Sequence, residues 1–362
     1  MRTVRCPPET EMRAAVYVGE SRIAVQRIPV PEIGPGEMLV EVRACGICHT
    51  DLKKVEHNLL PAPRIYGHET AGVVVAVGEG VTRFRPGDRV VAFHHIPCRN
   101  CFYCHHKLYA QCEGYKKVGI TAGYEPAGGG FAQYIRVLDW IVRDGVELIP
   151  EGVSFEAASF VEPVNTCHKA VVEADPQRGD VVLVQGQGPI GLVFTRLVSR
   201  LGATVIATDT IPERRALALR FGAAESHDPR TTDVARRMKE LTAGRGADMV
   251  LVAASARGIV DEAVRSSRPG SKILLFAQTS DAERIELSGA SICKDERTLF
   301  GVYSASVDLQ PESARLVFSG EVPVEELVSH RIRLEEIQQG IDLALHPNGK
   351  SLKIIVQPQR TA

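Results

Sequence analysis

The most specific spacing in the sequence is a group of four cysteines, Cys98, Cys101, Cys104 and Cys112. Short Cys-x-x-Cys spacings bring thiolates to one side of a loop, and four thiolates can surround zinc as a closed tetrahedron. Because a closed shell leaves no position for a substrate, such a metal would stabilise a lobe too short to build its own core. An iron–sulfur cluster and disulfide bonds are the alternatives for four cysteines.

A second set of metal-binding residue types lies earlier in the chain, in the segments Gly46–Asp51 (GICHTD) and Gly67–Glu69 (GHE). Cys48, His68 and Glu69 offer a thiolate, an imidazole and a carboxylate, the ligand types of a catalytic zinc that keeps one position open. In a regular strand the neighbours His68 and Glu69 would point to opposite faces. We therefore expect either a turn of the backbone there or a supporting role for one of the two residues.

A glycine fingerprint of the form G-x-G-x-x-G is made by Gly186, Gly188 and Gly191, with Pro189 and Ile190 between the last two glycines. The pattern alone is weak, because a chain this rich in glycine would contain it by chance roughly one time in four. Here an apolar run precedes it and an apolar helix pattern follows. The glycines permit a tight turn and bring backbone amides close to a pyrophosphate at the helix N-terminus. Proline is tolerated in the first turn because its missing N–H needs no partner there.

Asp209 ends the next apolar run, close to the roughly 20 residues expected between the fingerprint and a ribose-binding acid. Its carboxylate can accept hydrogen bonds from both ribose hydroxyls of NAD, and its charge would repel the 2′-phosphate of NADP. Arg214 and Arg215 follow and could hold a phosphate, although arginines on a helix surface are often solvated. The sequence favours NAD, with Arg214 counted among the cofactor-binding residues.

The cysteine-containing part of the chain has the pattern of a small β-barrel or sandwich. Short β-branched runs, such as Met12–Val18, Met38–Val42 and Gly72–Val77, are separated by turns that contain glycine and proline. Residues 1–11 show no periodicity, and we expect them to form a loose tail.

From about Asp180 the pattern changes to alternating strands and helices. The expected strands are Val181–Val184, Thr204–Thr208, Met249–Ala253 and Lys272–Phe276, and the expected helices are Pro189–Leu201, Glu213–Phe221 and Asp233–Leu241. Continuous apolar strands between helices indicate a parallel sheet that is covered on both faces. After about Ser304 the pattern becomes mixed and ends in the strand-like segment Leu352–Val356.

The composition excludes several classes of partner. A length of 362 residues allows two hydrophobic cores. A net charge of −1 gives no electrostatic footprint for nucleic acid or an anionic membrane. No apolar run approaches the ~20 residues that span a bilayer, and the N-terminus lacks the apolar core of a signal peptide. We expect a cytoplasmic protein with a small-molecule substrate.

These motifs, in this order and together with Gly129–Ala132 (GGFA), resemble the zinc-containing medium-chain dehydrogenases over essentially Met12 to Val356. The resemblance implies an α/β protein in which a GroES-like catalytic domain, residues 12–163 and 304–362, contains an inserted NAD-binding Rossmann domain, residues 164–303. It also implies two zinc ions per chain and NAD. We further expect a homo-oligomer, either a tetramer or a dimer.

The resemblance also assigns the metal ligands. It implies that Cys48, His68 and a third residue bind the catalytic zinc, with Glu69 binding it directly or lying nearby. Other alcohol dehydrogenases place a cysteine before the Rossmann domain, whereas Phe160–Thr166 here is similar to the Glu-Pro segment of sorbitol and threonine dehydrogenases. The third role therefore falls on Glu162, directly or through water, and Cys167 is the alternative.

Three residues that follow the motif cysteine receive roles by the same resemblance. Thr50 would hydrogen-bond the substrate oxygen, Asp51 would orient His68, and His49 would face the cofactor phosphates. The alternative for Thr50 and Asp51 is a turn or a helix cap after Cys48.

The implied reaction is the oxidation of a secondary alcohol or polyol, with ketone reduction in reverse, by hydride transfer to NAD and with zinc as Lewis acid. Sorbitol itself is not predicted, because Lys53 stands near a tyrosine position of animal sorbitol dehydrogenases and Gly301–Ser304 lacks their arginine. The alternatives are an amino-alcohol dehydrogenase of the threonine type, a simple or aromatic alcohol dehydrogenase, a zinc-independent quinone reductase of the same superfamily, and a non-catalytic zinc- and dinucleotide-binding relative.

Overall fold

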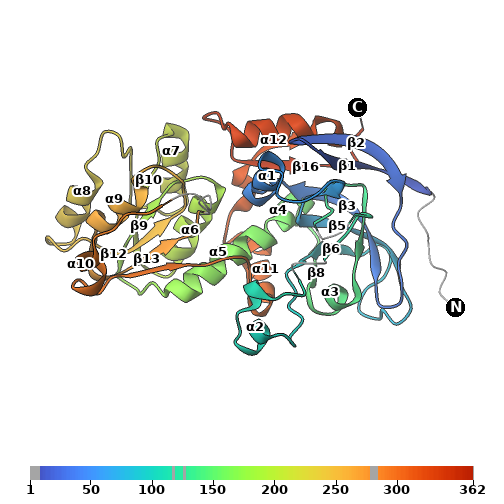
Figure 1. Cartoon of the computed structure of the whole chain (residues 1–362), viewed down its shortest axis with the longest axis horizontal. Coiled ribbons are helices and arrows are strands. Elements are labelled where there is room, and N and C mark those ends of the chain that lie inside the picture. The colour runs from blue at the N-terminus through green and yellow to red at the C-terminus, as the bar shows by residue number, and fades with distance from the viewer. Residues whose placement is uncertain (1–8, 116–118, 125–127, 278–283, 362) are drawn as a thin grey trace. The chain divides into compact units, whose positions relative to one another are not determined.

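The computed structural model of the protein describes residues 9–115, 119–124, 128–277 and 284–361 (Figure 1). They form two compact units. The first contains the chain up to Asn165 and again from Ala305 onwards, and the second runs from Thr166 to Ser304. Most of the expected tail lies outside the described residues.

The first unit is built around a mostly antiparallel sheet with the strand order β15-β16-β3-β5-β6-β8, in which β7 also pairs with β3. Its strands are β3 (Met38–Gly46), β5 (Glu69–Val77), β6 (Arg89–Ala92), β7 (Tyr134–Val137), β8 (Val146–Leu148), β15 (Val328–Ile332) and β16 (Lys353–Val356). A second sheet has the order β2-β1-β4 and consists of β1 (Glu11–Gly19), β2 (Arg22–Pro29) and β4 (Arg64–Ile65). Its helices are α1 (His49–Glu56), α2 (Phe102–His105), α3 (Asp139–Asp144), α4 (Phe155–Ser159), α11 (Gln310–Phe318) and α12 (Ile337–Leu345).

One apolar core joins the two sheets of the first unit, with Tyr17 from β1, Val40 from β3 and Phe131 from the chain before β7 fully buried in it. The register of the larger sheet matters most at the end of β3. There Gly46 lies opposite Glu69 of β5 on one side and opposite Ile355 of β16 on the other. Three strands that are far apart in sequence thus meet just before Cys48.

The second unit is a six-stranded parallel sheet with the order β11-β10-β9-β12-β13-β14. Its strands are β9 (Val181–Gln185), β10 (Thr204–Thr208), β11 (Glu225–His227), β12 (Ala247–Val252), β13 (Ser267–Leu275) and β14 (Thr298–Gly301). Its helices are α6 (Pro189–Arg200), α7 (Pro212–Arg220), α8 (Val234–Leu241), α9 (Ile259–Ser266) and α10 (Gly289–Cys293), and α5 (Val161–Ala174) begins in the first unit and ends in the second. The order runs outward from β9 in one direction and from β12 in the other. Because such crossovers are right-handed, the helices cover both faces, as a Rossmann fold requires.

The residues at the ends of the helices explain where the helices of this unit begin and end. Gly188 caps α6 and Pro189 occupies its first turn, while Gly202 follows its last turn with φ +86°. The Asp233 side chain caps α8 by accepting a hydrogen bond from the Arg236 amide at 3.0 Å. The predicted strand Thr204–Thr208 has these same bounds in the structure.

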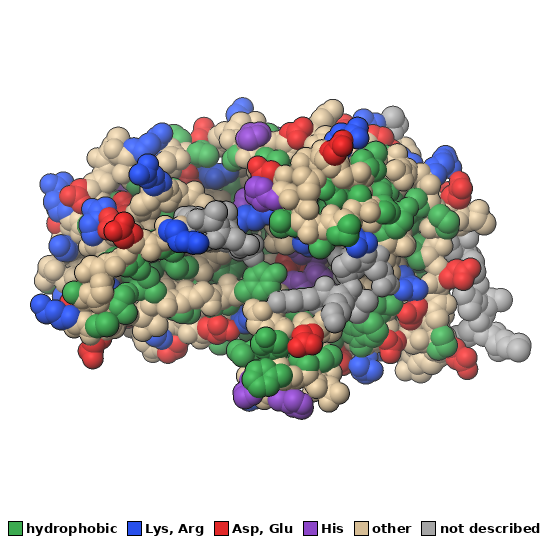
Figure 2. All heavy atoms as spheres, in the orientation of Figure 1, with side chains coloured by type: hydrophobic (Ala, Val, Ile, Leu, Met, Phe, Trp, Pro, Cys, Tyr) green, Lys and Arg blue, Asp and Glu red, His purple; other side chains and the backbone are tan. Residues whose placement is uncertain are grey.

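The surface carries no dominant charge. Figure 2 shows basic and acidic side chains interspersed over the visible face, in keeping with 43 Lys and Arg against 44 Asp and Glu. Within the described part of the chain, no helix is both long and apolar enough to cross a membrane.

Candidate metal centres and dinucleotide site

The four cysteines of the lobe lie together with their sulfur atoms within 4.8 Å of one another. Cys104 Sγ lies 3.6 Å from Cys101 Sγ and 3.9 Å from Cys98 Sγ. A tetrahedron with zinc–sulfur bonds of about 2.3 Å has edges of about 3.8 Å, so these separations fit one zinc ion. They are far longer than the roughly 2.05 Å of a disulfide bond. The donor set therefore fits a single closed metal shell.

The lobe also provides backbone donors to its sulfurs. The Cys98 amide donates to Cys112 Sγ at 3.2 Å. Hydrogen bonds from the backbone amides of Glu113 and Cys104 lower the pKa of the Cys101 thiol to about 6. Because metals bind thiolates, a lowered thiol pKa favours metal binding at neutral pH.

The mixed group of donors lies where β3 ends and β5 begins. Cys48 precedes the first residue of α1, and donor atoms of Cys48, His68 and Glu69 all lie within 4.8 Å of one another. Strand β5 starts at Glu69, so His68 lies just outside it. Gly67 before it has φ +92°, and a Cβ there would lie 2.6 Å from the Phe131 ring. The turn at Gly67 is what allows two sequence neighbours to present their donors to one point.

Asp51 holds the histidine of this group. Its Oδ1 lies 3.2 Å from His68 Nδ1, and its Oδ2 accepts a hydrogen bond from the Cys48 amide at 3.2 Å. Asp51 is 1% exposed, so both contacts are shielded from water. The carboxylate is thus helix cap and histidine partner at once, and it leaves His68 Nε2 as the nitrogen for a metal.

Lys353 of β16 is a charged neighbour of the mixed group that sequence reasoning missed. Its Nζ lies 2.6 Å from Glu69 Oε1 and 2.5 Å from Oε2, and both side chains are buried. Although burial lowers the pKa of the Lys353 ammonium, the Glu69 carboxylate raises it above its ordinary value. Gly46 makes room for the pair, because a Cβ at this position would collide with the Glu69 carboxylate. A lysine at the head of the apolar strand Lys353–Val356 is the signal that was available in the sequence.

Glu162 lies in the first turn of α5 and is 6% exposed. It is not part of the compact three-residue donor group; its Oε1 lies 3.6 Å from His95 Nδ1. Burial raises the pKa of Glu162 to about 7, with the charge of His68 opposing this shift and that of Glu69 adding to it. The Glu162 carboxylate therefore lies close enough to the mixed group to feel its charges. The positive charge nearby is too small to offset the cost of burying an ionised carboxylate.

Two further histidines follow β6 at this place, and the sequence analysis did not single them out. The rings of His94 and His95 have centroids 3.9 Å apart, and His94 lies edge-on to His68 at 5.5 Å. His94 is buried, and within the described residues its Nδ1 has no hydrogen-bond partner. The sequence signal was the pair itself, directly before the cysteine lobe.

The remaining predicted residues of this region are placed as follows. His49 and Thr50 occupy the first turn of α1, His49 exposed and Thr50 half-buried. Cys167 is buried in the second unit, where its sulfur lies 3.9 Å from the Ile190 carbonyl oxygen. The structure does not bring Cys167 into the three-residue donor group.

The glycine fingerprint forms the turn between β9 and α6. Gly186 has φ +89°, and a Cβ there would lie 2.5 Å from that of Ala254. A Cβ at Gly191 would collide with the Gly186 carbonyl oxygen. A Cβ at Gly188 would lie 3.9 Å from Arg214 Nη1, which places this guanidinium beside the fingerprint. The backbone amides at the start of α6 are thus open to a ligand anion, with a cation nearby.

Asp209 follows β10 and is fixed by the backbone on both sides. Its Oδ2 accepts a hydrogen bond from the Gln187 amide at 2.7 Å, and its Oδ1 accepts one from the Ile211 amide at 2.8 Å. The carboxylate of Asp209 is therefore tied directly to the fingerprint turn.

Comparisons with known proteins agree with this arrangement. Residues 34–144 match the model of the alcohol dehydrogenase GroES-like domain, and residues 189–319 match that of zinc-binding dehydrogenases. The chain is 31% identical to a sorbitol dehydrogenase of Bacillus subtilis, covering 96% of the chain and 98% of the relative. It is 29% identical to an (R,R)-butanediol dehydrogenase of Neisseria gonorrhoeae, covering 96% and 99%.

Solved structures match over nearly the whole chain as well. A zinc-binding dehydrogenase of Sinorhizobium meliloti bound to NADP superimposes with a TM-score of 0.86 at 28% identity, over 97% of this chain and 100% of that one. An alcohol dehydrogenase of Escherichia coli complexed with NADH gives 0.84 at 25% identity, over 97% and 100%.

Proposed function

Because the chain belongs to the zinc-containing medium-chain dehydrogenases, we propose that it oxidises a secondary alcohol or polyol with NAD as hydride acceptor, or reduces the ketone in reverse. Relatives named for sorbitol, butanediol and arabinitol support this class of substrate. The observation that carries the proposal is the convergence of Cys48, His68 and Glu69 on one point beside the buried Glu162.

We assign the catalytic zinc to Cys48, His68 and Glu162, with Glu162 binding directly or through water. Zinc at this position supplies Lewis acidity, which lowers the pKa of a substrate hydroxyl. The ammonium of Lys353 lies against both oxygens of Glu69 and neutralises that carboxylate, which favours Glu162 over Glu69 as the carboxylate that binds zinc. A buried carboxylate with a pKa raised to about 7 gains most from a nearby cation.

The other residues of the two sites would orient the ligands, hydrogen-bond the substrate hydroxyl and bind the cofactor. Asp51 holds the His68 ring, and Thr50, on the same turn of α1, would accept the proton of the substrate hydroxyl into a hydrogen bond. His49 at the start of that helix would meet the cofactor phosphates. In the second unit the fingerprint and Arg214 would bind the pyrophosphate, and Asp209 the adenosine ribose of NAD.

The four-cysteine lobe would hold the second zinc ion and stabilise its own loop. We also propose a cytoplasmic homo-oligomer, a tetramer or a dimer, which mass determination in solution tests directly.

Metal analysis and turnover together test the proposal. The wild type should contain about two zinc ions per chain and should form NADH with a panel of polyols, vicinal diols, amino alcohols and aromatic alcohols. Cys48→Ser should lose one zinc ion and at least ~100-fold in kcat/KM, since even residues that only support a ligand are worth 10–100-fold. Cys101→Ser should lose the other zinc ion and retain the one at Cys48. A wild type with one zinc ion, lost in Cys101→Ser, contradicts the catalytic site.

A further inference from the structure

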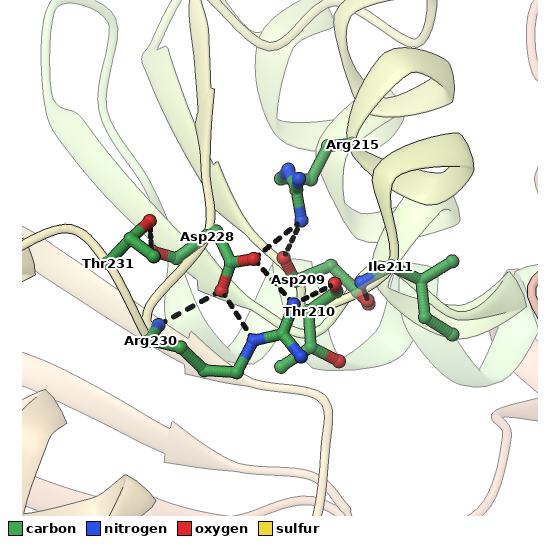
Figure 3. Close-up of polar contacts among 7 residues, drawn as sticks. All are labelled: Asp209, Thr210, Ile211, Arg215, Asp228, Arg230 and Thr231. Atoms are coloured by element: carbon green, nitrogen blue, oxygen red, sulfur yellow. Dashed lines mark hydrogen bonds and ion pairs between the residues drawn. The ribbon is translucent and has the colours of Figure 1, made fainter.

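Two aspartates leave the parallel sheet side by side at the carboxyl ends of β10 and β11. Thr208 and His227 are partners in the parallel register, and Asp209 and Asp228 follow them (Figure 3). Asp209 is the residue assigned to the cofactor ribose. Asp228 has no assigned role, and the site at which a 2′-phosphate would distinguish NADP from NAD lies at this edge of the sheet.

Arg230 binds the Asp228 carboxylate through two donors on one edge of its guanidinium. Arg230 Nε donates to Asp228 Oδ1 at 2.9 Å, and Nη2 donates to Oδ2 at 2.6 Å. The same Nη2 donates to the Thr210 carbonyl oxygen at 2.8 Å, which carries the arginine across to the residue after Asp209. The bidentate pair is the geometry in which arginine also binds phosphate.

Arg215 is held by the same carboxylate. Its Nη1 lies 3.3 Å from Asp228 Oδ2 and donates to the Asp209 carbonyl oxygen at 2.8 Å (Figure 3). The Arg230 amide donates to Asp228 Oδ1 at 3.0 Å. A carboxylate has about four acceptor positions, and these contacts fill all four of them. Asp228 therefore occupies both arginines that could otherwise reach a phosphate beside Asp209.

We propose that Asp228 is a determinant of cofactor specificity, which excludes NADP by occupying Arg215 and Arg230. The two aspartates and two arginines sum to zero charge, so a phosphate dianion would find no net attraction there and would have to displace Asp228 from its partners. Arg214 lies instead beside Gly188, at the fingerprint turn that would bind the pyrophosphate shared by both cofactors. Hydrogen bonds from Arg230 hold the pKa of Asp228 well below its ordinary value, so the carboxylate stays charged across the physiological range. The inference rests on the proposed NAD dependence and extends it to a residue outside the ribose contact.

Direct binding of the two reduced cofactors tests the proposal without turnover. Fluorescence titration of the zinc-loaded protein gives the Kd of NADH and of NADPH for each variant. Asp228→Asn removes the charge at constant size and should tighten NADPH binding by at least ~10-fold, the value of one strengthened charge-assisted contact. NADH binding should change by less than about threefold, because NADH has no 2′-phosphate.

A second substitution separates released arginines from relieved repulsion. In Asp228→Asn/Arg230→Gln, most of the gain in NADPH affinity should disappear. If the gain persists there and also in Asp228→Asn/Arg215→Gln, loss of repulsion alone explains it and the proposal is wrong. It is equally wrong if Asp228→Asn leaves NADPH affinity unchanged in a protein that binds NADH normally.

Matched variants complete the design. Asp261→Asn removes the same charge from another aspartate paired with an arginine in the second unit, 2.9 Å from Arg265 Nε, and should leave both Kd values unchanged. Asp228→Ser repeats the test if asparagine disturbs the loop, with thermal unfolding as the check on folding. A wild type that binds NADPH more tightly than NADH refutes the proposed NAD preference, an outcome distinct from the comparison of Asp228 variants with the wild type.

Discussion

The two groups of metal-binding side chains in the first unit are assembled in different ways. The four-cysteine lobe takes all its donors from one short stretch, Cys98 to Cys112, and needs only local backbone turns. The mixed group takes Cys48 from the residue before a helix, His68 from the turn before β5 and Glu69 from the first residue of that strand. Its charge is balanced by Lys353, which lies 284 positions beyond Glu69 in the sequence.

The difference separates a centre defined by spacing from one defined by strand register. Gly46 faces Glu69 on one side and Ile355 on the other, so the alignment of β5 and β16 against β3 brings acid and lysine together. A shift of one residue in either strand would turn its side chains to the other face. Assembly of the mixed group is therefore coupled to the pairing of distant strands, whereas assembly of the lobe depends on local turns.

Removing the lysine is the strongest way to test this coupling. Lys353→Met leaves the Glu69 carboxylate buried without its cation, and breaking a buried ion pair in this way costs about 3–5 kcal/mol. We expect a fall of that size in the free energy of unfolding, measured by urea denaturation, while the lobe retains its zinc.

Two further variants test whether this loss of stability comes from the Lys353–Glu69 pair. Lys353→Met/Glu69→Gln removes both charges and should recover most of the lost stability, as expected for directly coupled residues. Lys350→Met, at an exposed position of the preceding loop, should change stability by less than about 0.5 kcal/mol. If Lys353→Met is as stable as Lys350→Met, Lys353 is not needed to balance the charge of Glu69. The mixed group then does not depend on the distant strand β16 in the way the comparison with the lobe requires.

The same contrast explains what the sequence could predict. The lobe, the glycine turn and strand Thr204–Thr208 follow from local spacing and apolar pattern, which do not depend on the rest of the chain. Lys353 and His94 escaped notice because their surroundings arise only when distant strands pair. Glu162 was found by resemblance alone. The sequence analysis predicted no helix at this place, whereas the Glu162 side chain is buried in the first turn of α5.

The geometry of His68 offers a smaller perturbation of the mixed group. Asp51→Asn keeps the shape but weakens the hold on His68 Nδ1 and on the Cys48 amide. We expect a loss of about 10–100-fold in affinity for the catalytic zinc, the usual effect of removing a ligand's supporting carboxylate. Competition with a chelator measures it.

A control exists for the loss of the hydrogen bond from the backbone amide. Asp88 also accepts a hydrogen bond from a backbone amide, that of Arg85 at 2.9 Å, but lies in an exposed turn. Asp88→Asn should leave zinc affinity unchanged. Equal zinc affinities in Asp51→Asn and the wild type would mean that the turn at Gly67 alone fixes the histidine.

The smallest expected effect concerns the carboxylate that completes the mixed group. A carboxylate is a harder ligand than a thiolate and donates less charge, so it leaves zinc a stronger Lewis acid and exchanges more readily with water or a diol oxygen. Glu162→Gln removes the charge at constant size and should lower kcat/KM by at least ~10-fold, with the zinc of the lobe retained. Glu173→Gln makes the same change at an exposed position of the same helix and should have no effect.

Cys167→Ser should cost little, because its sulfur contacts the Ile190 carbonyl and lies outside the donor group. If Cys167→Ser instead abolishes activity and the catalytic zinc while Glu162→Gln is nearly silent, the third ligand is the cysteine. The readier exchange of the ligand with a diol oxygen, which rests on a carboxylate, would then have no physical basis in this protein.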